Sequence, residues 1–536
     1  MQLLPANTYL ADPALRGLLR AWLRPPTLDW AEPQLTKLGE LAATDLPKLG
    51  EECERSPAWL RPIEPWGQRV DEVVYPESWK RLAAVAARFG LAGLPYEPEA
   101  LRRFGPEVRV VHSALCYLFE PQTATYMCPV SMTDAAARVL SEFGSEPLQR
   151  DVLPHLISRD PDDSWTAGQW MTEQQGGSDV GANEVQARRE AGAWRLYGRK
   201  YFCSNVGGEV VLALARPEGA GPGTRGLGLF LVPRLLPDGG RNLYRIDRLK
   251  DKLGTRAMAT AEVTLEGAHA ELVGELDRGF LQMTPMLNIT RLHNAIASAA
   301  GMRRGLQLAR GYAAQRSAFG RLLEEQPLQR QVLTQLAVQA EATLLMTMRL
   351  AALLGRLECG VASEEERLVF RLGSSLTKLY TAKQAVASAS EALECFGGAG
   401  YMEDTGIARL LRDAQVLPIW EGTTNVLSLD TLRVLGKQGV DEAFFSELER
   451  LGSPGRQKAA DLAARVAGAG PDGSQRQARQ LAFALSEAWV GGLLTEAAGR
   501  GERESAVAEL WLNRDEPAAA DRFELVVDGG GAAVGV

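Results

Sequence analysis

The chain has 536 residues, of which 46% are hydrophobic and 24% are charged, and its formal net charge is −8 at pH 7. This length allows three or four domains, and the composition is that of a folded globular protein. The acidic balance argues against a dedicated nucleic-acid binder, because such proteins cluster Lys and Arg to neutralise phosphates.

The six cysteines lie far apart and form no C-x-x-C pair, so neither a zinc site nor a disulfide framework is indicated. Reduced thiols are typical of the cytoplasm. Residues 1–10 lack the basic and apolar regions of a secretory signal, and no uninterrupted apolar run approaches the length of a membrane span. We therefore expect a cytoplasmic protein without a membrane segment.

The first 165 residues have the pattern of a helical region with proline-rich breaks. Apolar residues recur at helical spacing in three segments, 79–89, 110–117 and 134–143. Thr133 or Asp134 is a suitable cap for the last of these helices. Residues 1–165 are therefore expected to form an N-terminal extension and a helical domain.

Residues 166–280 change to short β-prone runs separated by Gly and Pro, which is typical of a compact β domain. The clearest runs are 194–197, 210–215, 227–232 and 261–265. The helical period then returns over residues 281–440. The candidate helices there are 290–315, 327–354, 364–396 and 425–435.

Residues 441–536 form a fourth zone, with candidate helices at 457–467 and 475–494 and a frayed, Gly-rich end at 528–536. This zone contains about 10 basic and about 16 acidic residues and so holds much of the net negative charge. Helices, a β block and further helices in this order predict an α+β fold of segregated elements. The fourth zone is expected to be an additional helical domain.

Two short motifs lie near the start of the predicted β domain. In Met171–Asp179 (MTEQQGGSD), paired glycines let a backbone approach a ligand closely, and the hydroxyls of Thr172 and Ser178 suit a polar ring edge or a phosphate. In Lys200–Asn205 (KYFCSN), an aromatic beside a hydroxyl suits stacking on a flat cofactor. Taken alone, each motif is at least as well explained as an ordinary turn or strand.

Two further motifs follow in the helical region. Arg316–Gly320 (RSAFG), followed by Gln326, is expected at a helix end, where Gly suits a helix stop and Arg complements the helix C-terminus. Arg is also suited to gripping a pyrophosphate. Phe396–Tyr401 (FGGAGY) is a glycine cluster after a helix and, because no strand precedes it, is not the Rossmann dinucleotide fingerprint.

The fifth motif, Ile419–Asn425 (IWEGTTN), opens the last helix of the third zone. A carboxylate beside Trp and Ile would be partly desolvated, which would raise the pKa of Glu421 toward a range useful for proton abstraction. In the alternative interpretation, Glu421 is an acid of the first helical turn, favoured by the helix dipole, and the Thr-Thr-Asn segment caps the helix. The motif alone favours this second interpretation.

In this order and separation, the five motifs resemble the acyl-CoA dehydrogenase superfamily over roughly residues 70–440. Met-Thr-Glu-x-x-Gly-Gly-Ser-Asp and Trp-Glu-Gly-Thr-Thr-Asn are the most specific pieces. Residues 126–133 (YMCPVSMT), 249–254 (LKDKLG) and 432–435 (LRVL) look like the AidB branch, as do the long lead-in and the C-terminal zone. The resemblance implies the acyl-CoA dehydrogenase fold, with an N-terminal helical domain, a central β domain and a C-terminal helical bundle.

The resemblance also implies FAD as the cofactor. The FAD-binding positions that carry over are Met171, Thr172, Ser178, Phe202, Ser204, Arg316, Phe319, Gln326, Gly397, Gly398, Thr423 and Asn425. In the family, the first two motifs contact mainly the flavin and the phosphate region. The last three contact the pyrophosphate and adenosine half, partly from a neighbouring subunit. Glu394 stands where many relatives have Gln.

Glu421 matches the base that removes a proton from the carbon α to the thioester in this family. Isovaleryl-CoA dehydrogenases place their base on an earlier helix, just before an Arg, but here the residues are Thr290 and Arg291. Arg291, Ser178 and Gly422 are the implied substrate contacts. Because the family passes a hydride from the β-carbon to flavin N5, the resemblance implies α,β-dehydrogenation of a fatty or branched acyl-CoA.

The implied partners are the acyl-CoA substrate, electron-transfer flavoprotein or a similar acceptor, and further copies of the chain in a homo-oligomer, tetrameric in most relatives. Two other functions fit the motifs: a DNA-associated flavoprotein of the alkylation response, and an acyl-CoA-binding or sensing protein with little turnover. The acidic C-terminal zone disfavours DNA binding. The motifs do not separate the dehydrogenase from the sensor.

Overall fold

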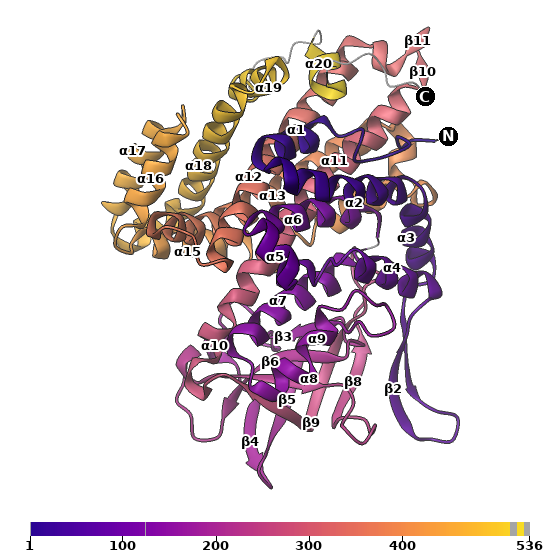
Figure 1. Cartoon of the computed structure of the whole chain (residues 1–536), viewed down its shortest axis with the longest axis vertical. Coiled ribbons are helices and arrows are strands. Elements are labelled where there is room, and N and C mark those ends of the chain that lie inside the picture. Colours follow the sequence, from indigo (N-terminus) through magenta and orange to yellow (C-terminus); the bar gives the residue numbers. More distant parts are fainter. Residues whose placement is uncertain (1, 124, 515–521, 530–536) are drawn as a thin grey trace. The chain divides into compact units, whose positions relative to one another are not determined.

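The computed structural model describes residues 2–123, 125–514 and 522–529, and its chain divides into two compact units. Unit 1 comprises Met1–Asp45, Ala100–Pro121 and Arg291–Val536, and unit 2 comprises Leu46–Glu99 and Gln122–Thr290. The expected α+β fold is confirmed, because the large sheet is confined to the middle of the chain and helices dominate on both sides of it (Figure 1).

Unit 2 is built around a sheet of seven strands. The strands are β3 (Ala167–Trp170), β4 (Gln186–Glu190), β5 (Ala193–Ser204), β6 (Val210–Pro217), β7 (Gly228–Pro233), β8 (Tyr244–Leu249) and β9 (Thr260–Val273). Their order is β3-β6-β4-β5-β9-β7, with β8 paired to β9 and a further pairing of β6 with β7 that closes the path. The four predicted β runs are confirmed as parts of β5, β6, β7 and β9.

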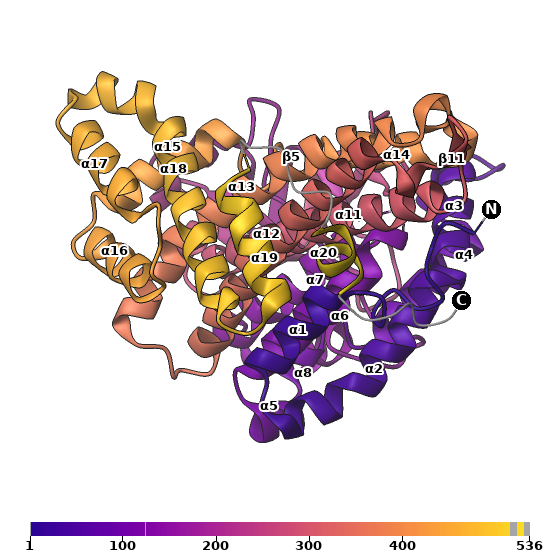
Figure 2. The same cartoon turned by 90° about the horizontal axis from the view of Figure 1, so that it is seen from above.

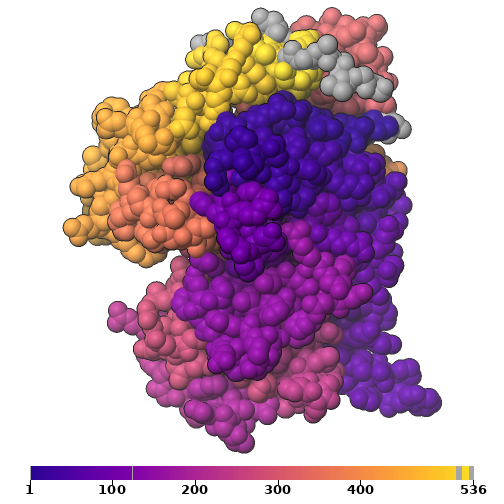
Figure 3. Space-filling view, in the orientation of Figure 1, coloured from indigo at the N-terminus to yellow at the C-terminus, as the bar shows by residue number. Residues whose placement is uncertain are grey.

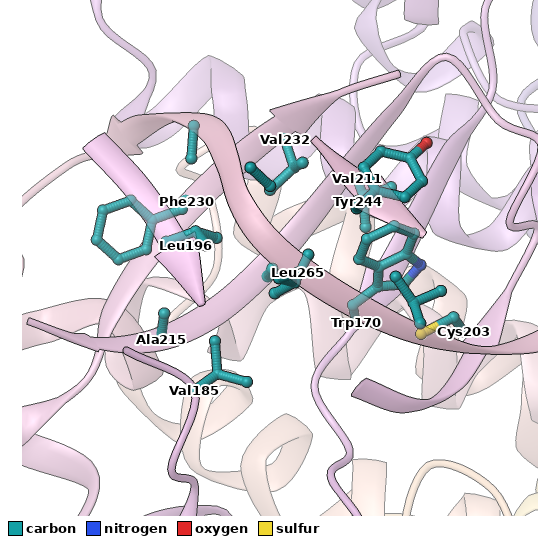
Figure 4. Packing of buried hydrophobic residues seen from close by; sticks show 14 of the residues in the cluster. Trp170, Val185, Leu196, Cys203, Val211, Ala215, Phe230, Val232, Tyr244 and Leu265 are labelled. Carbon is teal, nitrogen blue, oxygen red and sulfur yellow. The ribbon is translucent and has the colours of Figure 1, made fainter. Parts of the chain in front are cut away.

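The core of this sheet is apolar and fully enclosed. Trp170, Phe230 and Leu265 are at most 2% exposed and point into it with Val and Ala side chains of neighbouring strands (Figure 4). Such burial stabilises by about 25 cal/mol per Å² of apolar surface removed from water. The sheet therefore offers a rigid base for the loops that follow β3 and β5.

The N-terminal half of unit 2 differs from the prediction in two respects. Its elements are β1 (Trp59–Ile63), β2 (Arg69–Val74), α4 (Glu77–Arg88), α7 (Met127–Phe143), α8 (Glu146–Asp151) and α9 (Leu153–Leu156). The β1–β2 hairpin was not expected in a helical region. The predicted cap at Thr133 or Asp134 is wrong, because Pro129 is tolerated in the first turn of a helix and α7 already begins at Met127.

Unit 1 is a set of packed helices. The helices upstream of its C-terminal zone are α1 (Pro13–Trp22), α2 (Pro25–Ala43), α6 (Glu107–Phe119), α11 (Thr284–Ala313), α12 (Pro327–Glu358), α13 (Glu364–Glu394), α14 (Ile407–Ala414) and α15 (Thr424–Leu435). Two more, α3 (Asp45–Arg55) and α5 (Pro98–Phe104), lie at the boundaries between the units along the chain, as does the start of α11. The four helices predicted between residues 281 and 440 are confirmed, with ends displaced by up to six residues.

Contrary to the expectation from the sequence, helix α12 is long and apolar enough to cross a membrane, with a mean hydropathy of 1.3 over its most apolar stretch. However, 83% of that stretch is buried inside the structure. A helix that is apolar all round and covered by other helices is the core of a large helical unit. Within the described residues α12 contacts α6, α13, α18, α19 and α20.

The C-terminal zone packs directly on the bundle within unit 1 (Figure 2). Its helices are α16 (Val440–Arg450), α17 (Arg456–Ala467), α18 (Gly470–Ala498), α19 (Glu502–Leu512) and α20 (Phe523–Asp528). The indole of Trp489 in α18 is buried against Gly373 of α13, where a Cβ would lie 2.6 Å from the ring. The expected frayed end lies outside the described residues beyond Gly529.

The beginning and the end of unit 1 also meet. The guanidinium of Arg500 lies 5.8 Å from the ring centroid of Trp22, and Arg310 pairs with Asp528 at 2.6 Å. In the space-filling view, the indigo N-terminal helices and the yellow C-terminal helices lie against each other (Figure 3). The C-terminal zone is thus tied both to the bundle and to the N-terminal helices.

Candidate functional site

The loop after β3 is held from inside unit 2 by a buried ion pair. The Glu173 carboxylate accepts hydrogen bonds from the Lys200 ammonium at 2.7 Å and from the backbone N–H of Glu184 and Val185 at 2.7 and 3.2 Å. The Lys200 side chain is 0% exposed and that of Glu173 is 4% exposed. Burial lowers the pKa of Lys200, and the negative charge of Glu173 opposes that shift.

The same loop presents the hydroxyl predicted to bind a cofactor. A Cβ on Gly177 would lie 2.6 Å from the Thr172 hydroxyl oxygen, so the glycine is required for this close turn. The N–H of Tyr201 in β5 donates to the Thr172 carbonyl at 3.0 Å. Met171 is half-buried and Ser178 is exposed. The structure therefore brings the first two predicted motifs together.

Phe202 is turned outward by an irregularity in β5. Lys200 pairs with Val263 and Cys203 with Ala261, so two residues of β5 oppose one residue of β9 between these pairs. Such bulges redirect side chains and are frequent beside active sites. The side chain of Phe202 is 51% exposed, which leaves a ring face available to a flat ligand.

Lys250, at the end of β8, stabilises this aromatic edge. Its ammonium lies 3.4 Å from the ring centroid of Tyr201 and 4.5 Å from that of Phe202, and it bonds Glu262 at 2.8 Å. The Ser204 hydroxyl bonds that of Thr260 at 3.1 Å. The segment around Lys250 resembles the AidB branch, but its ring contacts could not be predicted, because they depend on the pairing of β8 with β9.

Glu421 lies outside the helix that follows it. Helix α15 begins at Thr424, and Thr423 is its N-cap, with a hydroxyl that accepts from the N–H of Val426 at 3.4 Å. Glu421 has φ +57° and Gly422 has φ +103°, so two successive residues are left-handed. The first-turn interpretation of Glu421 is therefore wrong. A non-glycine residue in this conformation costs about 1–2 kcal/mol and must be held by its surroundings.

A buried lysine and a partly buried arginine hold the Glu421 turn. Nε of Arg291, at the start of unit 1, donates to the Glu421 carbonyl at 3.4 Å. The ammonium of Lys378 in α13 donates to the Gly422 carbonyl at 2.6 Å. Burial lowers the pKa of Lys378 to about 7, and Glu421 opposes this shift. Arg291 and Glu421, both predicted, are thus neighbours, whereas Lys378 was missed because nothing in its helix marks it.

The indole of Trp420 fixes the other side of the turn. Its N–H donates to the side-chain carbonyl of Asn294 in α11. Gly422 has no room for a side chain, because a Cβ there would lie 2.9 Å from Leu427. The Glu421 side chain is half-buried. The arrangement presents one carboxylate from a rigid, strained turn, as a general base requires.

Behind Arg291 lies a cluster of charges centred on Asp430. Asp430 accepts from Arg371 at 3.0 Å, from Ser375 at 2.6 Å and from Arg433. Burial alone would raise the pKa of Asp430, but these partners outweigh it and hold the pKa well below its usual range. Arg291 lies 3.8 Å from the same carboxylate. Asp430 thus anchors the arginine that holds the Glu421 turn.

The remaining predicted positions lie at the surface of unit 1. Helix α11 ends at Ala313, and residues 317–322 form a small hairpin of β10 (Ser317–Ala318) and β11 (Arg321–Leu322). The predicted helix stop at Gly320 is therefore wrong, because Gly320, with φ +85°, lies in the hairpin turn. Phe319 is 100% exposed, and Gln326 bonds the Ala318 carbonyl at 3.1 Å.

The glycine cluster lies beside the end of α11. The rings of Tyr312 and Phe396 are 4.9 Å apart, which places the segment before the hairpin next to Gly397. Gly397 and Gly398 are exposed, and a Cβ on either would meet nothing within 4 Å. Arg316 and Asn425 are also exposed. These positions are accessible, and Asn425, in the first turn of α15, directly follows the Glu421 turn along the chain.

Comparison with known families matches three successive segments of the chain. Residues 2–163 match the adaptive response protein AidB N-terminal domain, residues 168–268 the acyl-CoA dehydrogenase middle domain, and residues 277–436 the acyl-CoA dehydrogenase C-terminal domain. The fourth zone is matched by none of the three.

Individual relatives cover most of the chain. Acyl-CoA dehydrogenase family member 11 of Caenorhabditis elegans is 41% identical over 83% of this chain and 73% of its own. AidB of Escherichia coli is 35% identical over 81% of this chain and 79% of its own. A crystal structure of C. elegans ACDH-11 in complex with C11-CoA superposes with a TM-score of 0.90 at 36% identity, covering 99% and 97% of the two chains. The chain therefore belongs to the acyl-CoA dehydrogenase family and, within it, is an AidB-like acyl-CoA dehydrogenase.

Proposed function

We propose that this chain catalyses the α,β-dehydrogenation of a fatty or branched acyl-CoA thioester, with Glu421 as the base. The observation that supports this most strongly is the Glu421 turn. A half-buried carboxylate on a left-handed turn, held by cations from two helices, is aimed by its surroundings rather than left mobile. A capping or surface acid would need no such support.

In the proposed reaction, the Glu421 carboxylate takes the proton from the carbon next to the thioester carbonyl. This proton is weakly acidic, so the carbonyl oxygen must be stabilised as negative charge develops on it. By resemblance to the family, the backbone N–H of Glu421 donates to that oxygen. The strained turn would then position both the base and the hydrogen-bond donor, which explains why it is held so firmly.

Acyl-CoA dehydrogenases are FAD-dependent enzymes, and the residues present fit FAD. The Thr172 hydroxyl lies in a close turn, where a Cβ at position 177 would displace it, and Phe202 exposes a ring nearby. When bound, FAD supplies the acceptor for the hydride that leaves the β-carbon. By resemblance to the family, Thr172, Ser178, Phe202 and Ser204 would hold its flavin end. Arg316 and Phe319 would hold the pyrophosphate and adenosine half of an FAD bound to a neighbouring subunit, with Gly397 and Gly398 near the same half.

We infer further that the working enzyme is a homo-oligomer. Apolar side chains near the hairpin and the glycine cluster are unusually exposed: Phe319 at 100%, Tyr401 at 87%, Leu328 at 72% and Met402 at 53%. Exposed apolar groups gathered in this way favour a protein interface.

The binding of C11-CoA by ACDH-11 supports a fatty acyl chain as substrate. Electron-transfer flavoprotein or a similar acceptor would reoxidise the enzyme.

The test is anaerobic titration of the purified, FAD-loaded protein with acyl-CoAs from short branched to long chains, including undecanoyl-CoA. A matching substrate should bleach the flavin absorbance. Glu421→Gln should keep FAD and lose about 10²–10⁴-fold in turnover, whereas Glu442→Gln, an exposed acid of α16, should not change it. Unchanged turnover in E421Q would remove Glu421 from its role. Tight binding of every acyl-CoA without any bleaching would instead identify a sensor.

A further inference from the structure

Lys378 is a buried lysine that the proposed reaction does not use. Its side chain is 0% exposed, in the middle of α13, and its ammonium donates to the Gly422 carbonyl at 2.6 Å. A buried charge is costly unless it is paired and hydrogen-bonded. A helical core that could hold Leu or Met at this position instead holds an ammonium group beneath the turn of Glu421.

Lys378 and Arg291 hold two successive carbonyls of the chain. Arg291 binds the carbonyl of Glu421 from α11, and Lys378 binds that of Gly422 from α13. These carbonyls belong to the two peptide units that follow the Glu421 Cα atom. Because Glu421 and Gly422 are both left-handed, the turn would relax toward ordinary backbone angles if either carbonyl were released, and the Glu421 side chain would change direction.

We propose that Lys378 is a positioning residue for Glu421: it holds the Gly422 carbonyl and so aims the carboxylate and the Glu421 N–H at the thioester. This inference rests on the proposed function of Glu421. It adds a residue on a different helix from Arg291, one whose ammonium bonds the backbone of the Glu421 turn.

The charge of Lys378 has a second effect. Glu421 and Lys378 attract each other, and Arg291 faces the same turn from α11. Behind Arg291, the charges of Arg371 and Arg433 are balanced in part by Asp430. A cation near a carboxylate favours its ionised form. Loss of the charge on Lys378 should therefore make Glu421 harder to ionise, so that it acts as a base only at higher pH.

The experiment measures proton abstraction by itself. 3,3-Dimethylundecanoyl-CoA has no hydrogen on its β-carbon, so it cannot pass a hydride to the flavin, but a base can still exchange its α-protons with D₂O. The exchange rate is followed by mass spectrometry between pH 5 and pH 9 for the FAD-loaded enzyme. The variants are Lys378→Met, Lys378→Gln, Glu421→Gln and, as matched control, Lys383→Met. Lys383 lies five residues further along α13 and is half-buried, and its side chain forms no hydrogen bond or ion pair with the described residues.

We expect K378M to exchange about 10²-fold more slowly than K383M at pH 7, since a small misplacement of a catalytic group costs this much. Both K378M and K378Q should move the acidic limb of the pH profile upward by about one pH unit or more. K378Q keeps a hydrogen-bond donor, so it should lose less in rate. FAD content and melting temperature report the folding of each variant, but a purely structural role would not move the pH profile.

The proposal is overturned if K378M and K378Q exchange within about twofold of the rate of K383M and their acidic limbs do not move, provided that E421Q is slow. If E421Q itself exchanges like the wild type, the proposed function fails instead. If K378M does not fold, the pH profile of K378Q decides: an unmoved limb overturns the proposal and a raised limb supports it.

Discussion

The buried pair of Glu173 and Lys200 is expected to determine the stability of the β domain and the order of its cofactor loop. Removing one member of a buried pair leaves an uncompensated charge and costs about 3–5 kcal/mol. In Glu173→Gln, the Lys200 ammonium loses its counter-charge and keeps only neutral acceptors, the Met171 carbonyl at 3.5 Å and the oxygen of the new amide. In Lys200→Met, Glu173 keeps two backbone donors, at 2.7 and 3.2 Å. We therefore expect E173Q to cost as much as K200M or more.

The double variant E173Q/K200M contains neither charge. Its loss in free energy of unfolding should be smaller than the sum of the two single losses by about 2 kcal/mol or more, because the members of a buried pair are coupled. The matched control is Arg245→Met in β8. This residue also bonds an acid, Glu266, at 2.7 Å, but the two side chains are 34% and 52% exposed. Exposed pairs contribute about 0–1 kcal/mol.

Urea unfolding followed by circular dichroism measures these losses in free energy. The FAD content at a fixed ratio of FAD to protein reports whether the loop with Thr172 and Ser178 still binds the cofactor. E173Q and K200M should also bind FAD more weakly, since the pair anchors the segment with Thr172 and Ser178. This account is contradicted if E173Q and K200M are as stable as R245M and their effects on the free energy of unfolding are strictly additive. The loop after β3 would then be held by its backbone hydrogen bonds alone.

Two further predictions concern unit 1. Gly373→Leu should lower the free energy of unfolding by about 1–3 kcal/mol, because a side chain there would collide with Trp489. The control is Gly301→Ala in α11, where a Cβ meets nothing within 4 Å; it should be neutral or stabilise the protein by about 0.5–1 kcal/mol. Equal effects of the two substitutions would show that α18 does not pack against α13 as described. The pKa of buried Lys378 is about 7, whereas that of an exposed lysine is 10.5. Between these pH values the unfolded chain therefore binds more protons than the folded chain. As a result, Lys378 should make the free energy of unfolding rise by up to about 5 kcal/mol from pH 7 to pH 10.5. K378M should lack this rise, and a difference in free energy of unfolding between wild type and K378M that stays constant from pH 7 to pH 10.5 would refute it.

Much of the architecture could be predicted from local sequence patterns. The helical period over residues 364–396 corresponds to α13, which begins with a Ser363–Glu366 capping box, and the β-prone run at 210–215 lies in β6. In both cases the signal is local, since one face or side of the element is continuously apolar over several residues. Thr172 and Phe202 also stand in short contiguous patterns, and the resemblance of these patterns to the family predicts them as cofactor contacts.

Other features depended on contacts between distant parts of the chain. Strands of two residues, such as β10 and β11, are too short for any period, so residues 317–322 resembled a helix end. The motif around Glu421 allowed a first-turn acid, and its resemblance to the family pointed to a base. The left-handed turn that Arg291 and Lys378 hold could not be predicted from the motif.

By itself, then, the sequence determined the order of helical and β segments, the motif residues and the family to which they point. Only the tertiary structure decided which buried charges face one another. Lys378 and Gly422 are 44 residues apart and Lys200 and Glu173 are 27 apart. A lysine within a helix or strand has no local pattern that distinguishes it from a surface lysine. Its role follows from the acceptor that folding places beside it and from the exclusion of water there, which makes that one hydrogen bond necessary.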